Sequence, residues 1–387
     1  MTTKTIYLDH SATTPVDPRV VEAMSPFWSE VYGNPSSIYG LGRRAAAALE
    51  DARRRIARIL NCGPTEIVFT GCGTESDNLA LRGVALAAAA RGKRHIVTTP
   101  IEHHAVLHTA HDLAEHFDCE VTLVPVDRYG LVDPDAVVAA IRPDTALVSI
   151  MMANNEVGTI QPIAEIAARV RAHGVPFHTD AVQAGGHLPL DVEALQVDLL
   201  SLSAHKFYGP KGVGLLYVRR GVRLLPVQTG GGQERGRRSG TENVPYIVGM
   251  ATALELAQAE REAEARRLTL LRDRLIQGLM ARIPDLILTG HPTQRLPGHV
   301  SLLVPGAEAE TLLIALDMAG IAASSGSACA TGAPTPSHVL TAMGYKPQEA
   351  MAALRLTLGR VNTEADVDFV IEKLAEIVPR IRGQRQG

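Results

Sequence analysis

Several features that would assign this chain to a familiar class are scarce in its sequence. The 387 residues include only four cysteines, with no CxxC pair, so we expect neither a disulfide framework nor a cysteine zinc site. No stretch approaches the roughly 18 apolar residues that a membrane helix needs, and the N-terminus lacks an apolar core of signal-peptide length. We therefore expect a cytoplasmic protein with no membrane partner.

An excess of charge of either sign is also missing. Lysine and arginine number 38, against 41 aspartates and glutamates, which gives a formal net charge of −3. Binding to a polyanion needs a concentrated positive field, so direct nucleic-acid binding is not expected. Hydrophobic residues make up 46% and charged residues 20% of the chain, as in folded globular proteins. The length is enough for two domains or one large domain.

Short β-branched runs alternate with helical stretches from about residue 65 to about residue 217. This alternation predicts a mostly parallel sheet that helices cover on both faces. The expected strands are 66–69, 95–97, 121–124, 146–150, 197–200 and 214–218, with a further strand ending near Asp180. The expected helices are 74–90, 104–117, 134–141 and 162–173.

The chain beyond Pro245 has a different composition. A stretch rich in Ala, Glu, Arg and Leu reaches about residue 282 and predicts one long connecting helix. After it we expect strands at 286–288, 299–304 and 354–358 and helices at 308–319 and 363–382. We interpret this part as a smaller α+β domain. Residues 15–260 would then form the large α/β domain, and residues 1–14 and 261–387 the small one.

Two charged residues follow expected strands of the large sheet. Lys206 comes just after an apolar strand, where desolvation lowers the pKa of an amine so that its neutral form can attack a carbonyl carbon. Asp180 ends another strand, at the sheet edge where ligands bind, and a carboxylate there can pair with a protonated pyridine nitrogen. Taken singly, Lys206 would be a solvated loop residue and Asp180 a turn or capping residue. The two strand ends together are more informative.

A glycine-rich turn, TGCGT from Thr70, leads from a strand into a helix. Backbone N–H groups and the Thr74 hydroxyl at such a helix start can cradle a phosphate. The turn matches neither GxGxxG nor GxxxxGK[ST], which disfavours a dinucleotide or a nucleoside triphosphate. His103 opens the next helix and could stack on a ring. An amine, a carboxylate, a phosphate cradle and a stacking group are what pyridoxal 5'-phosphate requires.

Short motifs occur in order along nearly the whole chain, from about residue 6 to about residue 382. They are YLDHSATTP from Tyr7, GNPSS from Gly33, TESDN from Thr74, NNEVG from Asn154, TDAVQ from Thr179, HK from His205, RSGT from Arg238 and SSGSAC from Ser324. In their residues and in their order, these motifs resemble those of the cysteine desulfurases of the NifS/IscS type, in the class-V aminotransferase family. The resemblance implies the type I fold of pyridoxal-phosphate-dependent transferases, with a seven-stranded, mostly parallel sheet. It also implies an enzyme that converts L-cysteine to L-alanine.

The same resemblance implies roles for individual residues. Lys206 would bind the cofactor covalently, Asp180 would pair with its ring nitrogen, and His103 would stack on the ring and transfer protons. Cys329 would accept the sulfur as a persulfide, and Asn34 and Arg355 would bind the substrate carboxylate. The remaining cofactor contacts would be made by Gly73, Thr74, Asn155, Gln183, Ser203 and His205, and by Thr241 across a homodimer.

Cys329 stands apart from the other cysteines. It lies in a run of small residues, 323–334, that predicts an exposed loop in which a thiol can ionise and move. Cys62, Cys72 and Cys119 are expected to be packing residues. We expect the loop to carry the persulfide to acceptor proteins, such as a scaffold for iron–sulfur clusters or a protein of tRNA thiolation.

Other readings stay open at this point. A selenocysteine lyase or an aminotransferase would use the same cofactor fold, and a non-catalytic scaffold could dock iron–sulfur assembly partners. The residues after Cys329, ATGAPTP, depart from the run usual in the bacterial housekeeping type, which leaves the acceptor undetermined. His104 and His108 have the spacing of a metal-binding pair, but no carboxylate or thiol stands at ligand spacing, so we expect no metal.

Overall fold

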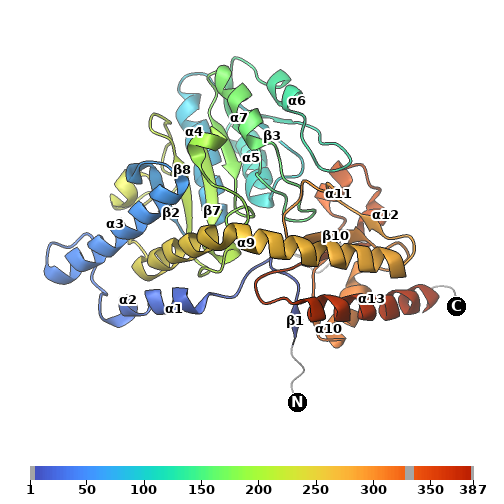
Figure 1. The fold of residues 1–387 in the computed structure, drawn as a ribbon. Coiled ribbons are helices and arrows are strands. Elements are labelled where there is room, and N and C mark those ends of the chain that lie inside the picture. Colours follow the sequence, from blue (N-terminus) through green and yellow to red (C-terminus); the bar gives the residue numbers. More distant parts are fainter. Residues whose placement is uncertain (1–4, 327–334, 385–387) are drawn as a thin grey trace.

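The computed structural model describes residues 5–326 and 335–384, and Cys329 lies outside the described residues. At its centre is a seven-stranded sheet with the strand order β2-β8-β7-β6-β5-β3-β4 (Figure 1). Neighbouring strands are parallel except at β8, which is antiparallel to β2 and β7. The strands are β2 (Ile67–Thr70), β3 (His95–Thr98), β4 (Glu120–Leu123), β5 (Thr145–Ser149), β6 (Phe177–Asp180), β7 (Leu199–Ser203) and β8 (Gly214–Val218).

Helices cover both faces of this sheet, and alternation along the strands decides which face each residue joins. Leu216 of β8 packs into a core with residues of α4 and α5, whereas Leu215 and Tyr217 pack into a core with α3, α7 and α9. The helices of this part are α1 (Pro18–Met24), α2 (Pro26–Ser29), α3 (Gly40–Leu60), α4 (Gly73–Ala89), α5 (His104–His116), α6 (Pro134–Ala139), α7 (Ile163–Ala172) and α8 (Val192–Leu195).

The helix α9 (Val244–Arg282) runs for 39 residues and connects two cores, as the composition predicted. Its first half contributes Leu254 to the core of the large sheet. Its second half contributes Leu268 and Leu275 to a core with the antiparallel sheet β12-β10-β9. The elements of this second part are β9 (Ile287–Leu288), β10 (His299–Leu303), α10 (Ala309–Met318), α11 (His338–Ala342), α12 (Pro347–Ala350), β12 (Ala353–Thr357) and α13 (Glu364–Gln384).

The beginning of the chain also belongs to this second part. The short strand β1 (Ile6–Tyr7) pairs in parallel with β11 (Ile321–Ala322), and Asp9 forms a bridge with Thr357 of β12. The chain then crosses to the large sheet at Thr14, whose Oγ1 donates to the carbonyl of His205 at 2.9 Å. The N-terminal segment therefore lies between the two parts.

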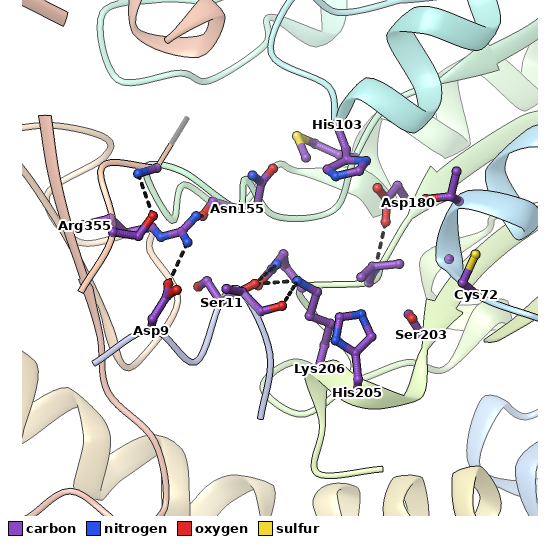
Figure 2. A pocket seen from close by; sticks show the side chains of 18 of the residues that line it. Asp9, Ser11, Cys72, His103, Asn155, Asp180, Ser203, His205, Lys206 and Arg355 are labelled. Carbon is purple, nitrogen blue, oxygen red and sulfur yellow. Dashed lines mark hydrogen bonds and ion pairs between the residues drawn. The ribbon is translucent and has the colours of Figure 1, made fainter. Parts of the chain in front are cut away.

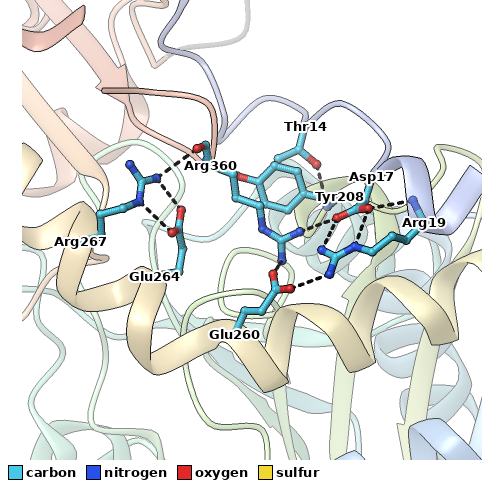
Figure 3. A network of polar contacts seen from close by, with 8 residues as sticks. All are labelled: Thr14, Asp17, Arg19, Tyr208, Glu260, Glu264, Arg267 and Arg360. Atoms are coloured by element: carbon cyan, nitrogen blue, oxygen red, sulfur yellow. Dashed lines mark hydrogen bonds and ion pairs between the residues drawn. The ribbon is translucent and has the colours of Figure 1, made fainter. Parts of the chain in front are cut away.

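A polar network fixes the junction of the two parts beside α9 (Figure 3). Arg360, just after β12, binds Asp17 at 2.8 Å and Glu260 of α9 at 2.9 Å. Its guanidinium carbon lies 4.3 Å from the centre of the Tyr208 ring, and the Tyr208 hydroxyl accepts a 2.8 Å hydrogen bond from the Arg360 N–H. Because Tyr208 lies just after Lys206, the network fixes β12 relative to the turn that carries this lysine.

The structure agrees with most of the expected elements and adds some. The strand expected at 214–218 is β8, whereas the one expected at 197–200 is β7 and begins at Leu199. The helix α3 was not predicted, although its buried residues Ala45, Leu49, Ala52 and Ile56 recur at helical spacing. No helix in the described part of the chain has the length and apolar character needed to span a membrane.

Candidate active site

A cavity of about 500 Å³ lies between the carboxyl ends of the parallel strands and the second part of the molecule (Figure 2). This volume is typical of a small-molecule site. Of the predicted site residues, those that line it are Gly73, Thr74, His103, Asn155, Asp180, Gln183, Ser203, His205, Lys206 and Arg355. Asn34 and Thr241 are exposed and do not line this cavity. Cys329 lies outside the described residues.

Lys206 ends a short 3-10 turn (Ala204–Lys206) that follows β7. Its Nζ donates to the carbonyl oxygen of Ser11 at 2.5 Å and to that of Ala12 at 2.8 Å. Burial, together with the positive charge of Arg355, lowers the pKa of the Lys206 amine from 10.5 to about 8. A useful fraction of neutral amine is therefore present near neutral pH, as the sequence predicted from desolvation.

Asp180 is the last residue of β6, and its buried carboxylate accepts a 2.9 Å hydrogen bond from the Val182 N–H. A second acid, Asp77 of α4, lines the same wall, and its Oδ1 has no hydrogen-bond partner among the described residues. Burial raises the pKa of both acids, and for Asp77 the nearby charge of Asp180 adds to this effect. The wall thus holds two acids that favour a proton or a cationic partner.

His103 caps the start of α5 and faces the cavity beside Asp180 (Figure 2). Its Nδ1 accepts a 3.1 Å hydrogen bond from the Ala105 N–H, so the neutral ring carries its hydrogen on Nε2. Desolvation by the surrounding walls lowers the pKa of His103 to about 4, and the charge of Lys206 contributes. The ring is therefore neutral at physiological pH and can stack on a flat group or exchange a proton at Nε2.

The start of α4 forms one end of the cavity. The first backbone N–H groups of a helix have no acceptor within it, and here they follow Cys72 at Gly73 and Thr74. A Cβ atom on Gly73 would lie only 2.8 Å from Cγ2 of Val182 and 3.2 Å from Cβ of Ser203, so the site requires glycine. The geometry of this end of the cavity therefore suits an anion.

Arg355 of β12 lies on the other side of the cavity, facing Asp9 (Figure 2). Its Nη2 binds Asp9 at 2.7 Å, and its Nη1 donates to the carbonyl of Asn155 at 3.0 Å. Its buried Nε has no hydrogen-bond partner among the described residues. The backbone of Arg355 also exchanges hydrogen bonds of 2.6 and 3.2 Å with Ser324. The strand that carries this arginine therefore anchors the chain just before the segment that contains Cys329.

These residues fit pyridoxal 5'-phosphate. The glycine-lined helix start suits a phosphate, and the lysine with a lowered pKa suits a carbonyl carbon. The buried carboxylate of Asp180, at the end of β6, suits a protonated ring nitrogen.

Sequence reasoning gave no role to three residues of the walls: Asp9, Ser11 and Asp77. Asp9 and Ser11 belong to the YLDHSATTP motif, and Asp77 belongs to TESDN, so the motifs contained the signal. Their partners, however, come from distant parts of the chain.

The other cysteines and the histidine pair can now be placed. Cys119 is buried and Cys62 is half-buried, in line with packing roles. Cys72 is exposed and lines the cavity, so the expectation of a packing residue was wrong, because its position before α4 turns it towards the site.

The rings of His104 and His108 are stacked, with their centres 4.6 Å apart. In residues 5–326 and 335–384, no group of three or more His, Cys, Asp or Glu side chains is arranged to hold a metal ion.

Comparison with known proteins assigns the chain to a family. The family model for class-V aminotransferases matches residues 6–370. A protein named cysteine desulfurase IscS from Methanosarcina thermophila is 54% identical over 379 residues, which cover 98% of this chain and 93% of that protein. A protein of the same name from Dictyoglomus turgidum is 48% identical over 377 residues, covering 97% of this chain and 95% of that protein.

A solved structure described as a NifS-like protein is also similar. It matches with a TM-score of 0.91 and 43% sequence identity, and the match covers 97% of this chain and 100% of that chain. The chain therefore belongs to the class-V aminotransferase family, and within it to the cysteine desulfurases. Pyridoxal 5'-phosphate is a general property of this family. The predicted family and α/β fold are confirmed.

Proposed function

We propose that this chain converts L-cysteine to L-alanine and passes the sulfur to Cys329 as a persulfide. The observation that supports this most is the convergence of Lys206, Asp180, His103 and Arg355 on one cavity. The chain enters the segment that contains Cys329 directly from this cavity, since Ser324, Ser325 and Gly326 line it. The similarity to cysteine desulfurases over nearly the whole length supports the same reaction.

Each wall of the cavity has a role in holding the cofactor. Lys206 would bind pyridoxal 5'-phosphate covalently, Asp180 would pair with its ring nitrogen, and His103 would cover the ring. When bound, the group supplies an electron sink for the substrate α-carbon. The remaining contacts would be made by Gly73, Thr74, Asn155, Gln183, Ser203 and His205, and by Thr241 across a homodimer.

Arg355 would bind the substrate carboxylate. Asp9 and the carbonyl of Asn155 hold its guanidinium in place at the cavity wall. Arginine suits this task because its fixed fork of donors matches a carboxylate. Asn34, the other residue proposed for this role, is exposed, and its Oδ1 accepts a 2.9 Å hydrogen bond from the Ser36 N–H. Its part in binding is a proposal from the family resemblance.

The proton and sulfur transfers then follow from the side chains. The substrate amine would displace Lys206 from its covalent bond, and the freed Lys206 amine, whose pKa is about 8, takes the proton from the substrate α-carbon. The Cys329 thiolate attacks the substrate sulfur: an S–S bond forms, the C–S bond breaks, and its electron pair goes to the substrate carbon. The β-carbon, which held the sulfur, takes a proton and becomes the methyl group of alanine. The α-carbon takes back the proton held by Lys206, which completes the product. An acceptor thiolate then attacks the outer sulfur of the persulfide and releases the Cys329 thiolate.

We also propose a cytoplasmic homodimer with two domains, residues 15–260 and residues 1–14 with 261–387. The two cores that α9 joins support this division. Exposed apolar residues around α2 support a dimer, since Trp28, Tyr32 and Ile38 are 57%, 66% and 89% exposed. The sulfur would go to acceptor proteins, such as an iron–sulfur scaffold or a protein of tRNA thiolation.

The variant Cys329→Ser tests the proposed function. It should bind the cofactor and still change its visible absorbance when cysteine is added, whereas alanine production should fall by about 10³-fold or more. In the unaltered chain, mass spectrometry after addition of cysteine should find one extra sulfur atom on the peptide with Cys329 and none on the peptide with Cys72. Near-normal turnover by Cys329→Ser would contradict the proposal and favour a lyase that needs no thiol.

A further inference from the structure

Glu156 is a buried acid, 6% exposed, and it has no role in the proposed reaction. It lies in the NNEVG turn, next to Asn155 of the cavity wall. The turn is held from within, because Oδ1 of Asn154 accepts hydrogen bonds from the N–H groups of Glu156 at 2.8 Å and Val157 at 2.9 Å. These hydrogen bonds hold the backbone of Glu156 in place and so limit the region that its side chain can reach.

The Glu156 side chain contacts the chain on both sides of the segment that contains Cys329. After that segment, the Ser337 hydroxyl donates to Oε2 of Glu156 at 2.5 Å, and Nδ1 of His338 lies 3.8 Å from Oε1. Before it, the backbone passes Glu156 at Gly326, where an added Cβ atom would lie 3.6 Å from both Cβ and Oε2 of Glu156. One carboxylate thus lies against both ends of the segment.

Each end has a further anchor that makes this contact specific. Before the segment, the Ser324 hydroxyl accepts a 3.1 Å hydrogen bond from the Gly326 N–H. After it, the Ser337 hydroxyl caps α11 by accepting from the Leu340 N–H at 3.1 Å. Nε2 of His338 donates to the carbonyl of Glu102 at 2.9 Å. Because the Ser337 hydroxyl donates to Glu156 while it accepts from α11, the start of this helix is fixed to the NNEVG turn.

Stability alone is a weak reason for an acid in this place. Burial raises the pKa of Glu156, and the hydrogen bond from Ser337 and the charges of His338 and Arg355 oppose that increase. A buried carboxyl group costs desolvation energy that a neutral residue of similar size would avoid. The contacts of Glu156 with the chain on both sides of the Cys329 segment therefore explain a buried acid here better than stability does.

We propose that Glu156 is a positioning residue for Cys329. It ties the chain after the Cys329 segment to the turn that carries Asn155, beside the chain that enters the segment at Gly326, and so sets where both ends lie relative to the cavity. It acts through these contacts and does not itself line the cavity. The inference rests on the proposed function of Cys329 as sulfur acceptor.

Kinetics of three single variants and one double variant test this role. Glu156→Ala and Ser337→Ala should each lower kcat for alanine formation about 10- to 100-fold, because small displacements of a reacting group have effects of that size. The KM for cysteine and the absorbance change on adding cysteine should stay as in the unaltered chain. Glu156→Gln keeps an oxygen that accepts from Ser337 and should recover most of the rate. The double variant should be no slower than either single one, since both remove the same bond.

A second measurement needs no turnover. The rate at which iodoacetamide alkylates Cys329, followed by mass spectrometry, should rise several-fold in Glu156→Ala and Ser337→Ala. Glu349→Ala is the matched control, since the Glu349 carboxylate accepts a similar 2.8 Å hydrogen bond at the start of α12, from the Lys346 N–H. It should leave the alkylation rate unchanged.

Two outcomes would overturn the inference. One is a kcat and an alkylation rate in Glu156→Ala equal to those of the unaltered chain. The other is loss of the cysteine-induced absorbance change in Glu156→Ala, which would place its role at the cofactor through Asn155. If the unaltered chain forms no persulfide on Cys329, the proposed function fails. The alkylation rates would still decide whether Glu156 positions this segment.

Discussion

The two walls of the cavity are built in different ways. The wall with Asp180, Lys206 and Gly73 comes from the ends of neighbouring strands and the turns directly after them. The opposite wall depends on the pair Asp9 and Arg355, which are 346 positions apart in the chain. Local patterns encode each strand end of the first wall, and sheet pairing brings these ends together. The second wall exists only when both ends of the chain have docked.

The walls also differ in what holds them. Parallel strand pairing fixes the first wall, since β6 pairs with β7 from His178 to Asp180. The second wall depends on the β1–β11 pairing and on the junction where Arg360 binds Asp17 and Glu260. In the proposed function, the sheet edge would bind the cofactor and the docked second part would bind the substrate. Substitutions in the two walls should therefore have separable effects.

The largest effect is expected in the first wall. Lys206→Ala should lower turnover by roughly 10⁴-fold or more, because both the covalent attachment and the proton acceptor are lost. Borohydride treatment followed by mass spectrometry should then find no cofactor fixed to the chain. Lys211→Ala, an exposed lysine nearby, is the control and should retain the fixed cofactor. Fixation of the cofactor in Lys206→Ala would refute the assignment of this lysine.

A smaller and different effect is expected in the second wall. Arg355→Gln should lower kcat/KM for cysteine about 10²-fold, mainly through KM, because charge-assisted hydrogen bonds to the substrate carboxylate are lost. The affinity for the cofactor, measured by absorbance titration, should stay close to that of the unaltered chain. Asp9→Asn should have a weaker effect in the same direction, since the guanidinium keeps its charge. Equal loss of cofactor affinity in Arg355→Gln would show that the walls are not separable.

The smallest effect links the two walls through charge. In the cofactor-free chain, the Lys206 amine should titrate with a midpoint near pH 8, well below the ordinary 10.5. Arg355→Gln should raise this midpoint by part of the difference, because the charge of Arg355 is the second cause and burial the first. NMR of the chain after reductive methylation with a labelled carbon measures both midpoints. An unchanged midpoint in the variant would exclude this coupling.

The lowered pKa of Lys206 also makes the free energy of unfolding depend on pH. Between pH 8 and 10.5 the unfolded chain holds a proton on Lys206 that the folded, cofactor-free chain has released. This group alone therefore makes unfolding more costly as the pH rises through that window, and it disfavours the fold most below it. The cost of burying the charged Lys206 amine disappears when the amine is neutral.

Short patterns in the amino-acid sequence encode several features of this protein. The strand at 214–218, the long helix α9 and the strand-end positions of Lys206 and Asp180 follow from spacing and composition within a few residues. The motifs identified the family and most of the cavity lining. These features were predictable because helix and strand periodicity and turn chemistry act locally.

The contacts between distant residues, in contrast, depend on the packing of the whole chain. The pairing of Ile6 with Ile321, the contact of Asp9 with Arg355 and the carbonyls of Ser11 and Ala12 at the Lys206 amine have no local signal. The exposure of Cys72 and the position of Glu156 between Gly326 and Ser337 are of the same kind. Such contacts depend on how two cores dock along α9, and docking is a property of the whole packed chain rather than of any segment.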